Sequence, residues 1–180
     1  MDYLTRINGM GGDDYRVHQD LKELFEGRFL FQRNRYEVLV LSEQAPRYTL
    51  DFLVHFRNVS GIIDMICEGD ELAFSLRVNP VVTKFMDGKN RRLPIEDYRL
   101  KEWIGQKLND AGLEARFVYK TEGGRRSTRK DKTVTLSSVM VRGVVRIVDI
   151  DVFLKVLDSG IGHAKGLGYG FLNVFGEDEP

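Results

Sequence analysis

The sequence predicts an α+β fold made of two ferredoxin-like halves in tandem, each a four-stranded antiparallel sheet with helices on one face. Two observations support this prediction. Apolar stretches typical of strands occur in both parts of the chain, and amphipathic helical stretches lie between them. The order of strands and helices is also similar in the two halves, which we place at residues 1–82 and 83–180. Only the order of strands and helices repeats, and the two halves share no residue motif.

The first half is predicted as β-α-β-(α)-β. YLTRIN near the start alternates as a strand does, and Asp13 or Asp14 can cap the helix that follows. That helix carries an apolar stripe formed by Val17, Leu21, Leu24 and Phe25. YEVLVLSE (36–43) and ELAFSLRVNP (71–80) are predicted as strands, whereas LDFLVHFRNV (50–59) fits either a short helix or an extended segment.

The second half repeats this order. We predict a helix over 94–112, with Pro94 in its first turn and Gly112 just after its end. A strand, ARFVYKT, leads into a basic loop, and a long strand, TVTLSSVMVRGVVRIV, returns from it and is expected to bend at Gly143. The last helix is DIDVFLKVLDSG and the closing strand is YGFLNVF.

The composition argues against several kinds of metal or disulfide site. The 180 residues are 42% apolar and 30% charged, as in globular proteins. The single cysteine, Cys67, excludes an internal disulfide and a cysteine-based zinc site, and three histidines argue against a multi-histidine metal centre. MDYLTRINGMGGDD at the start is neither a signal peptide nor a membrane span. We therefore expect a cytoplasmic protein with no membrane partner, whose chemistry uses no cofactor and no tightly held metal.

Charge is distributed unevenly although the net charge is +0. Residues 120–132 carry six Lys or Arg against two acids, and residues 84–101 carry six against three. Because salt screens exposed charges beyond roughly 8 Å, such local excesses attract a polyanion more than the net charge suggests. Each segment alone is also compatible with an ordinary solvated loop.

Residues 159–175, SGIGHAKGLGYGFLNVF, form a glycine-rich segment between the last helix and the last strand. A nucleotide-binding glycine loop follows a strand and opens a helix, so the reversed order here argues against a nucleotide-binding enzyme. Two interpretations stay open. The backbone N–H groups could line an anion such as an RNA phosphate, with His163 and Lys165 projecting beside it. Alternatively, the glycines only let the helix and the strand pack closely.

The first helix contains the candidate chemistry. YRVHQDLKELF places Tyr15, His18 and Lys22 on one line beside the apolar stripe. Cleavage of RNA by its own 2′-hydroxyl needs a base, an acid and a cation near the phosphate, and histidine titrates near neutral pH. The alternative, which spacing alone favours, is a partly exposed histidine on an ordinary helix. His55, inside an apolar run, is expected to be packed.

Several stretches together are similar to a known family. YRVHQDLKELF and FLFQRNRYEVLVLSEQAP resemble the N-terminal region of the type I-E CRISPR repeat endonucleases, the CasE family. LAFSLRVNPVVTK resembles the family's strand that ends in Asn-Pro, and VRGVVRIVD with DSGIGHAKGLGYGFLNV resembles its last strands and glycine loop. These stretches keep their order over nearly the whole chain.

The resemblance implies metal-independent cleavage of the CRISPR repeat stem-loop at its base, which leaves a 2′,3′-cyclic phosphate and a 5′-hydroxyl. It also implies that the enzyme stays on the mature crRNA with the other Cascade subunits. His18 falls on the family's catalytic histidine and Tyr15 on its neighbouring tyrosine. The alternative is a non-catalytic RNA-binding subunit of the same fold, in which His18 is structural. The expected RNA-binding residues are Lys22, taken from the helix stripe, and Arg125, Arg126, Arg129, Lys130, Lys132, Gly160, Gly162, His163, Lys165 and Gly168.

Overall fold

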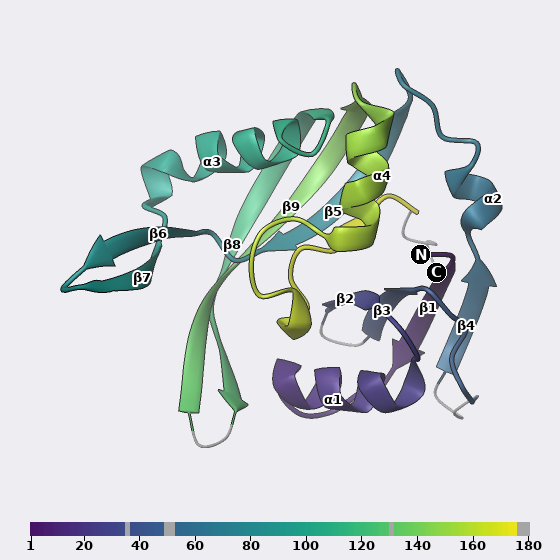
Figure 1. Ribbon diagram of the computed structural model, residues 1–180, viewed down its shortest axis with the longest axis horizontal. Coiled ribbons are helices and arrows are strands. Elements are labelled where there is room, and N and C mark those ends of the chain that lie inside the picture. The colour runs from purple at the N-terminus through teal and green to yellow at the C-terminus, as the bar shows by residue number, and fades with distance from the viewer. Residues whose placement is uncertain (35–36, 49–52, 130–131, 176–180) are drawn as a thin grey trace.

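The computed structural model describes residues 1–34, 37–48, 53–129 and 132–175, and for 53–54, 125–129 and 132–134 it describes the backbone. The strands form two four-stranded antiparallel sheets and a separate two-stranded hairpin (Figure 1). The strand orders are β2-β3-β1-β4 and β8-β9-β5-β10, so the first, second, third and fourth strands of each half occupy equivalent places. The predicted tandem ferredoxin-like α+β fold is therefore confirmed.

The first sheet consists of β1 (Tyr3–Asn8), β2 (Phe29–Arg33), β3 (Glu37–Ser42) and β4 (Leu53–Asn58). One face of this sheet packs against α1 (Asp14–Leu24). The helix begins where expected, because the Asp13 carboxylate accepts the Arg16 N–H at 2.9 Å as an N-cap. Val17, Leu21 and Leu24 are buried against the sheet, and each such side chain contributes roughly 1.5–3 kcal/mol of burial free energy.

The second sheet consists of β5 (Glu71–Val78), β8 (Leu113–Arg129), β9 (Lys132–Ile147) and β10 (Leu172–Asn173). Its core side is covered by α3 (Asp97–Asn109) and α4 (Ile150–Ser159). The strand predicted at 71–80 is present, but it pairs with β9 and β10, not with the first sheet. By strand pairing the chain thus passes from one sheet to the other between residues 58 and 71, ahead of the boundary expected at 82/83.

Other elements differ from the expectation in local detail. The basic segment 84–101 is not a loop, since β6 (Val81–Met86) and β7 (Lys89–Pro94) form a hairpin that projects from the second half (Figure 1). The helix predicted from Pro94 begins at Asp97, because Pro94 ends β7. The ambiguous segment 50–59 contains strand β4, and the short helix α2 (Ser60–Ile63) follows it.

The segment between α4 and β10 packs against the first half and so holds the two halves together. The face of the first sheet opposite α1 carries Leu4, Leu30, Leu39 and Leu41, and Phe171 from the end of the glycine-rich segment packs against them. Within the same segment a short 3₁₀ turn, η1 (Lys165–Leu167), contacts both α1 and β2. The last part of the second half therefore reaches the helix that carries His18.

Candidate active site at the junction of the halves

His18 lies on α1 with its ring against the aromatic side chains of β2. The ring centroid is 5.4 Å from that of Phe29 and 6.1 Å from that of Phe31, and the plane of the imidazole is inclined by 27° to the Phe31 ring. Residues 29 and 31 point to the same face of the sheet because side chains alternate along a strand. The imidazole is half-buried, so these two rings fix its position and leave part of it accessible.

The surroundings of His18 favour its neutral form. Burial lowers the pKa of His18 below its ordinary value, and the positive charge of Lys22 lowers it further. The Nδ1 atom is buried and has no hydrogen-bond partner among the described residues. An imidazole with a lowered pKa is mostly neutral at neutral pH and can accept a proton there.

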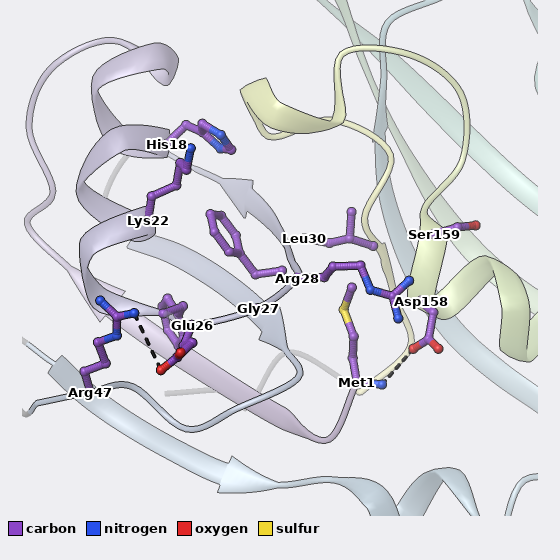
Figure 2. Close-up of a pocket in the computed structure, with 12 residues that line it drawn as sticks. Met1, His18, Lys22, Glu26, Gly27, Arg28, Leu30, Arg47, Asp158 and Ser159 are labelled. Atoms are coloured by element: carbon purple, nitrogen blue, oxygen red, sulfur yellow. Dashed lines mark hydrogen bonds and ion pairs between the residues drawn. The ribbon is translucent and has the colours of Figure 1, made fainter.

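Tyr15 and Lys22 extend this line along the helix. Tyr15 lies one turn before His18 and is half-buried, whereas Lys22 lies one turn after it and is exposed. His18 and Lys22 line a pocket of about 540 Å³ between α1, the start of β2 and the end of α4 (Figure 2). Two residues of the predicted stripe, His18 and Lys22, therefore border a cavity at the junction of the halves.

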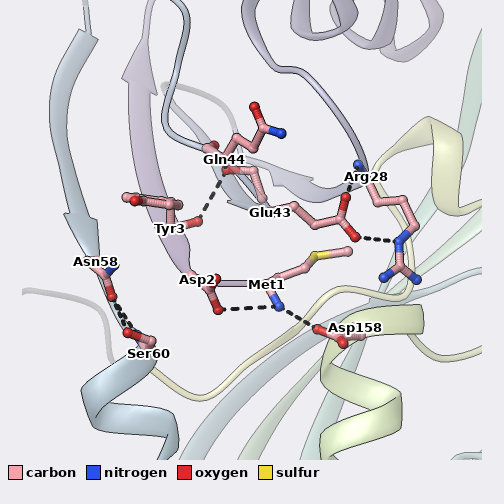
Figure 3. Close-up of polar contacts among 10 residues, drawn as sticks. Met1, Asp2, Tyr3, Arg28, Glu43, Gln44, Asn58, Ser60 and Asp158 are labelled. Atoms are coloured by element: carbon pink, nitrogen blue, oxygen red, sulfur yellow. Dashed lines mark hydrogen bonds and ion pairs between the residues drawn. The ribbon is translucent and has the colours of Figure 1, made fainter.

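The pocket's other charged groups are held in pairs. They are Arg28 with Glu43 (2.6 Å), Arg47 with Glu26 (3.6 Å) and the Met1 amino group with Asp158 (2.7 Å; Figures 2 and 3). The backbone N–H and the guanidinium of Arg28 both donate to Glu43 and lower the pKa of that carboxyl. Lys22, by contrast, has no ion-pair partner within the part of the chain that the structure describes, so its ammonium is available to an anion.

The structure supports the packing interpretation of the glycine-rich segment at two of its glycines and does not test the RNA-contact interpretation at the others. Gly160 and Gly168, expected to bind RNA, are buried, and a Cβ on them would come within 3.2 Å of Leu30 and 2.8 Å of Phe31 respectively. Such close approach explains why these two positions need glycine, and it means that they shape the loop. Gly162 and His163 are exposed and Lys165 is half-buried, so these remain candidates for RNA contact.

The same segment brings one glycine to His18. A Cβ on Gly166 would lie 3.6 Å from Cε1 and 3.8 Å from Nε2 of the His18 ring. Gly166 is exposed, so the absence of a side chain keeps the imidazole open on this side. In the sequence analysis, no site role was given to Gly166, Phe29 or Phe31. The alternation in FLFQR was a usable signal for β2, whereas the approach of Gly166 depends on how the halves pack.

The basic segment forms a long antiparallel ribbon. Arg125, Arg126 and Arg129 lie on β8 and Lys132 on β9, while Lys130 lies outside the described residues. The ribbon extends beyond the second sheet to the level of α1, and β8 contacts this helix (Figure 1). The structure therefore brings the backbone of the ribbon whose basic residues are expected to bind RNA close to the helix that carries Tyr15 and His18.

His55 is exposed on β4, so the expectation that it is packed was wrong. Among the described residues, no group of three or more His, Cys, Asp or Glu side chains is arranged to hold a metal ion. Each helix within 1–34, 37–48, 53–129 and 132–175 is too short or too polar to cross a bilayer.

Comparison with known proteins agrees with this arrangement over the whole chain. A family model described as "CRISPR associated protein" matches residues 5–175. The Cascade subunit CasE of Escherichia coli K12 is 29% identical, over 96% of this chain and 98% of the relative. The crystal structure of Cas6e from the same organism superposes with a TM-score of 0.77 at 27% identity, covering 95% of this chain and 97% of that one. Thermus thermophilus Cse3, bound to an RNA representing a pre-cleavage complex, has a TM-score of 0.76 at 19% identity, with 96% and 98% covered. The chain belongs to the family of CRISPR-associated proteins, as a member of its type I-E CasE group.

Proposed function

We propose that this protein cleaves CRISPR repeat RNA at the base of the repeat's stem-loop, by attack of an RNA 2′-hydroxyl on the adjacent phosphate. The observation that carries this proposal is the position of His18. Its ring is half-buried against two phenylalanines at the pocket between the halves, with Gly166 and Lys22 beside it. Membership of the CasE group, and the RNA-bound Cse3 of similar fold, make repeat RNA the substrate to test.

The proposed reaction uses only the RNA and these side chains. Neutral His18 takes the proton of the 2′-hydroxyl through Nε2, because Nδ1 is buried, and O2′ forms a bond to phosphorus. The bond from phosphorus to O5′ breaks, and Tyr15 donates a proton to O5′. Lys22 offsets the negative charge that gathers on the phosphate oxygens. The products are a 2′,3′-cyclic phosphate and a 5′-hydroxyl.

We further propose that the protein holds its product as a subunit of a Cascade complex, as the name of its Escherichia coli relative states for that protein. The basic ribbon is the proposed grip on the stem. The major groove of A-form RNA is too deep and narrow for side chains to read its bases, but a thin ribbon can follow its phosphates. Arginine suits this role because its planar fork of donors fits phosphate oxygens.

A cleavage assay on the repeat RNA of the organism's own CRISPR locus tests the function. We expect cutting to persist in EDTA, because the residues above supply the proton transfers and the positive charge. A single 2′-deoxy substitution at the attacking nucleotide should abolish cutting and leave binding nearly intact. His18→Ala should lower the single-turnover rate roughly 100-fold or more, the usual size for a lost general acid or base.

Each arm can contradict a different part of the proposal. Loss of cutting in EDTA, restored by added magnesium, would refute metal independence. Cutting of the deoxy substrate would show that water is the nucleophile. Tight binding of the repeat by a parent protein that never cuts it would favour the alternative, an RNA-binding subunit in which His18 is structural.

A further inference from the structure

Three parts of the candidate site meet at Arg77 of β5. The side chain is only 4% exposed, and its guanidinium donates to both carboxylate oxygens of Glu122, from Nε at 2.9 Å and from Nη2 at 3.3 Å. Its Nη1 donates to the backbone carbonyl of Arg33 at the end of β2. The Arg77 carbonyl accepts the N–H of Gly170, at 2.7 Å, from the end of the glycine-rich segment. One residue thus contacts the ribbon, the first sheet and the glycine-rich segment.

Glu122 marks the base of the basic ribbon. The pairing of β8 with β9 shifts between Thr121 and Gly123, so Glu122 is the extra residue of a β-bulge, and Gly123 has a φ of +77°. Bulges redirect a side chain, and here the Glu122 carboxylate meets Arg77. The buried Ser138 hydroxyl of β9 donates to the same carboxylate at 2.7 Å. Because the basic residues follow directly, these contacts fix where the ribbon leaves the sheet.

Arg33 continues the contacts to the first helix. Its guanidinium donates to the carbonyls of Gly12 at 2.7 Å and Met10 at 3.2 Å, and it lies 3.7 Å from the carboxylate of buried Asp14. These residues form the glycine-rich approach to α1, immediately before Tyr15. The approach is thus held at two backbone carbonyls by a residue whose own carbonyl is bound by Arg77.

The chemistry of the cluster favours a role in geometry over one in stability. A buried ion pair stabilises a fold weakly, because the loss of hydration offsets most of the attraction. The Arg77 guanidinium instead directs three donors at fixed angles to two separate elements. A lysine at this position keeps the charge but cannot reproduce that fork.

Building on the function proposed above, we propose that Arg77 is a positioning residue. With Glu122 and Arg33 it fixes the basic ribbon in register with the helix that carries Tyr15 and His18. RNA held by the ribbon is then presented to His18 in one alignment. Since a misplacement of about 1 Å can cost on the order of 100-fold in rate, this contact chain acts on cleavage more than on affinity.

Arg77→Lys is the test, with Arg116→Lys as its matched control. Arg116 also pairs with a glutamate of a second-sheet strand, Glu71, at 3.3 Å, but on the exposed surface. In the RNA-free protein, Arg77→Lys should speed amide hydrogen exchange about threefold or more in the segment 9–15 and not in α3. At saturating protein it should lower the single-turnover cleavage rate roughly 10-fold or more, while affinity for the repeat stays within about threefold. Arg116→Lys should change none of these quantities.

The exchange measurement separates failure of this inference from failure of the proposed function. A parent protein that does not cut repeat RNA would refute the function, while the exchange result would still decide on the contact chain. Unchanged exchange at 9–15 in folded Arg77→Lys protein would overturn the inference, and so would an equal rise in α3, which indicates general loosening. If Arg77→Lys does not fold, Glu122→Gln takes its place, with the same expected and contradicting results.

Discussion

At the scale of the single residue, His18 owes its properties to two aromatic neighbours from β2 and one cationic neighbour from its own helix. Phe29 and Phe31 bury one side of the ring, and Lys22 adds a positive charge next to it. Burial and the like charge act in the same direction, since each disfavours the imidazolium form. A base with a lowered pKa keeps its activity at mildly acidic pH, where an ordinary histidine would be protonated.

This gives a prediction for the pH dependence of cleavage. If neutral His18 is the base, the single-turnover rate should fall on the acid side with a midpoint below the ordinary histidine value. Lys22→Met should move that midpoint to higher pH, because loss of the neighbouring cation favours the imidazolium and raises its pKa. The measurement is the rate between pH 5 and 8 at constant ionic strength. Lys155→Met on the exposed surface of α4 is the control, and a midpoint that Lys22→Met leaves in place would contradict the prediction.

The sequence was enough to place Tyr15, His18 and Lys22 on one line, because helical spacing and an aspartate cap are local signals. The sequence did not show which other parts of the protein lie opposite these three side chains. The close approach of Gly166 to the His18 ring brings together residues that are far apart in the sequence, and no local pattern encodes that approach. For the same reason, Gly160 and Gly168 looked equivalent to Gly162 until their packing was known.

At the scale of the element, the β8–β9 ribbon is the feature with the most direct functional consequence. It is much longer than an ordinary hairpin, and its outer part carries a run of arginine and lysine beyond the bulge at Glu122. A ribbon that leaves the sheet and reaches α1 can hold one end of a substrate while the helix acts on another part of it.

Replacing Arg125, Arg126, Arg129 and Lys130 by alanine should separate binding from chemistry. We expect weaker repeat binding and a flatter dependence of affinity on salt, since each lost phosphate contact should reduce the log–log slope by about 0.7–0.9. The rate at saturating protein should fall much less than the affinity. A salt titration and a single-turnover rate check both statements. Unchanged affinity at every salt concentration would show that the RNA is held elsewhere, for which the β6–β7 hairpin and Lys165 are the next candidates.

Elements with strong periodicity were predicted correctly, and those set by tertiary context were not. α1 and α4 have apolar stripes and aspartate caps, and both begin within one residue of the expected start. The β6–β7 hairpin was missed because its exposed, charged residues give no apolar alternation, and β2 was missed although its alternation was a usable signal, because the strand is only five residues long. β5 was recognised as a strand but placed in the wrong half, since pairing with β9 and β10 leaves no mark in its own sequence.

At the scale of the whole molecule, Phe171 links the two halves. It belongs to the chain segment that leads into the second sheet, but its side chain packs on the leucine face of the first sheet and is 1% exposed. The pocket at His18 lies at the same junction, because its lining comes from α1, β2 and the end of α4, and one lining residue, Leu30, packs in the same cluster as Phe171. Stability of the junction and geometry of the site are therefore coupled.

Phe171→Ala should lower the free energy of unfolding by about 3–5 kcal/mol, the usual cost of truncating a fully buried phenylalanine. Urea unfolding followed by circular dichroism measures this. Phe85→Ala on the projecting hairpin is the matched control, since Phe85 is 75% exposed and its truncation should change the free energy by about 0.5 kcal/mol or less. Equal, small effects of the two substitutions would show that the halves do not depend on this contact.

The position of Phe171 and the glycine-rich segment late in the chain also sets the order in which the protein matures on the ribosome. The helix with His18 and the sheet beneath it are synthesised well before the segment that covers the leucine face and forms the loop beside the imidazole. At roughly 5–20 residues per second, a nascent chain carries an uncovered leucine face for many seconds. The growing polypeptide therefore passes through a stage in which an apolar face is exposed and the candidate active site is still incomplete. Synthesis of the glycine-rich segment supplies both the cover of the leucine face and the loop beside His18.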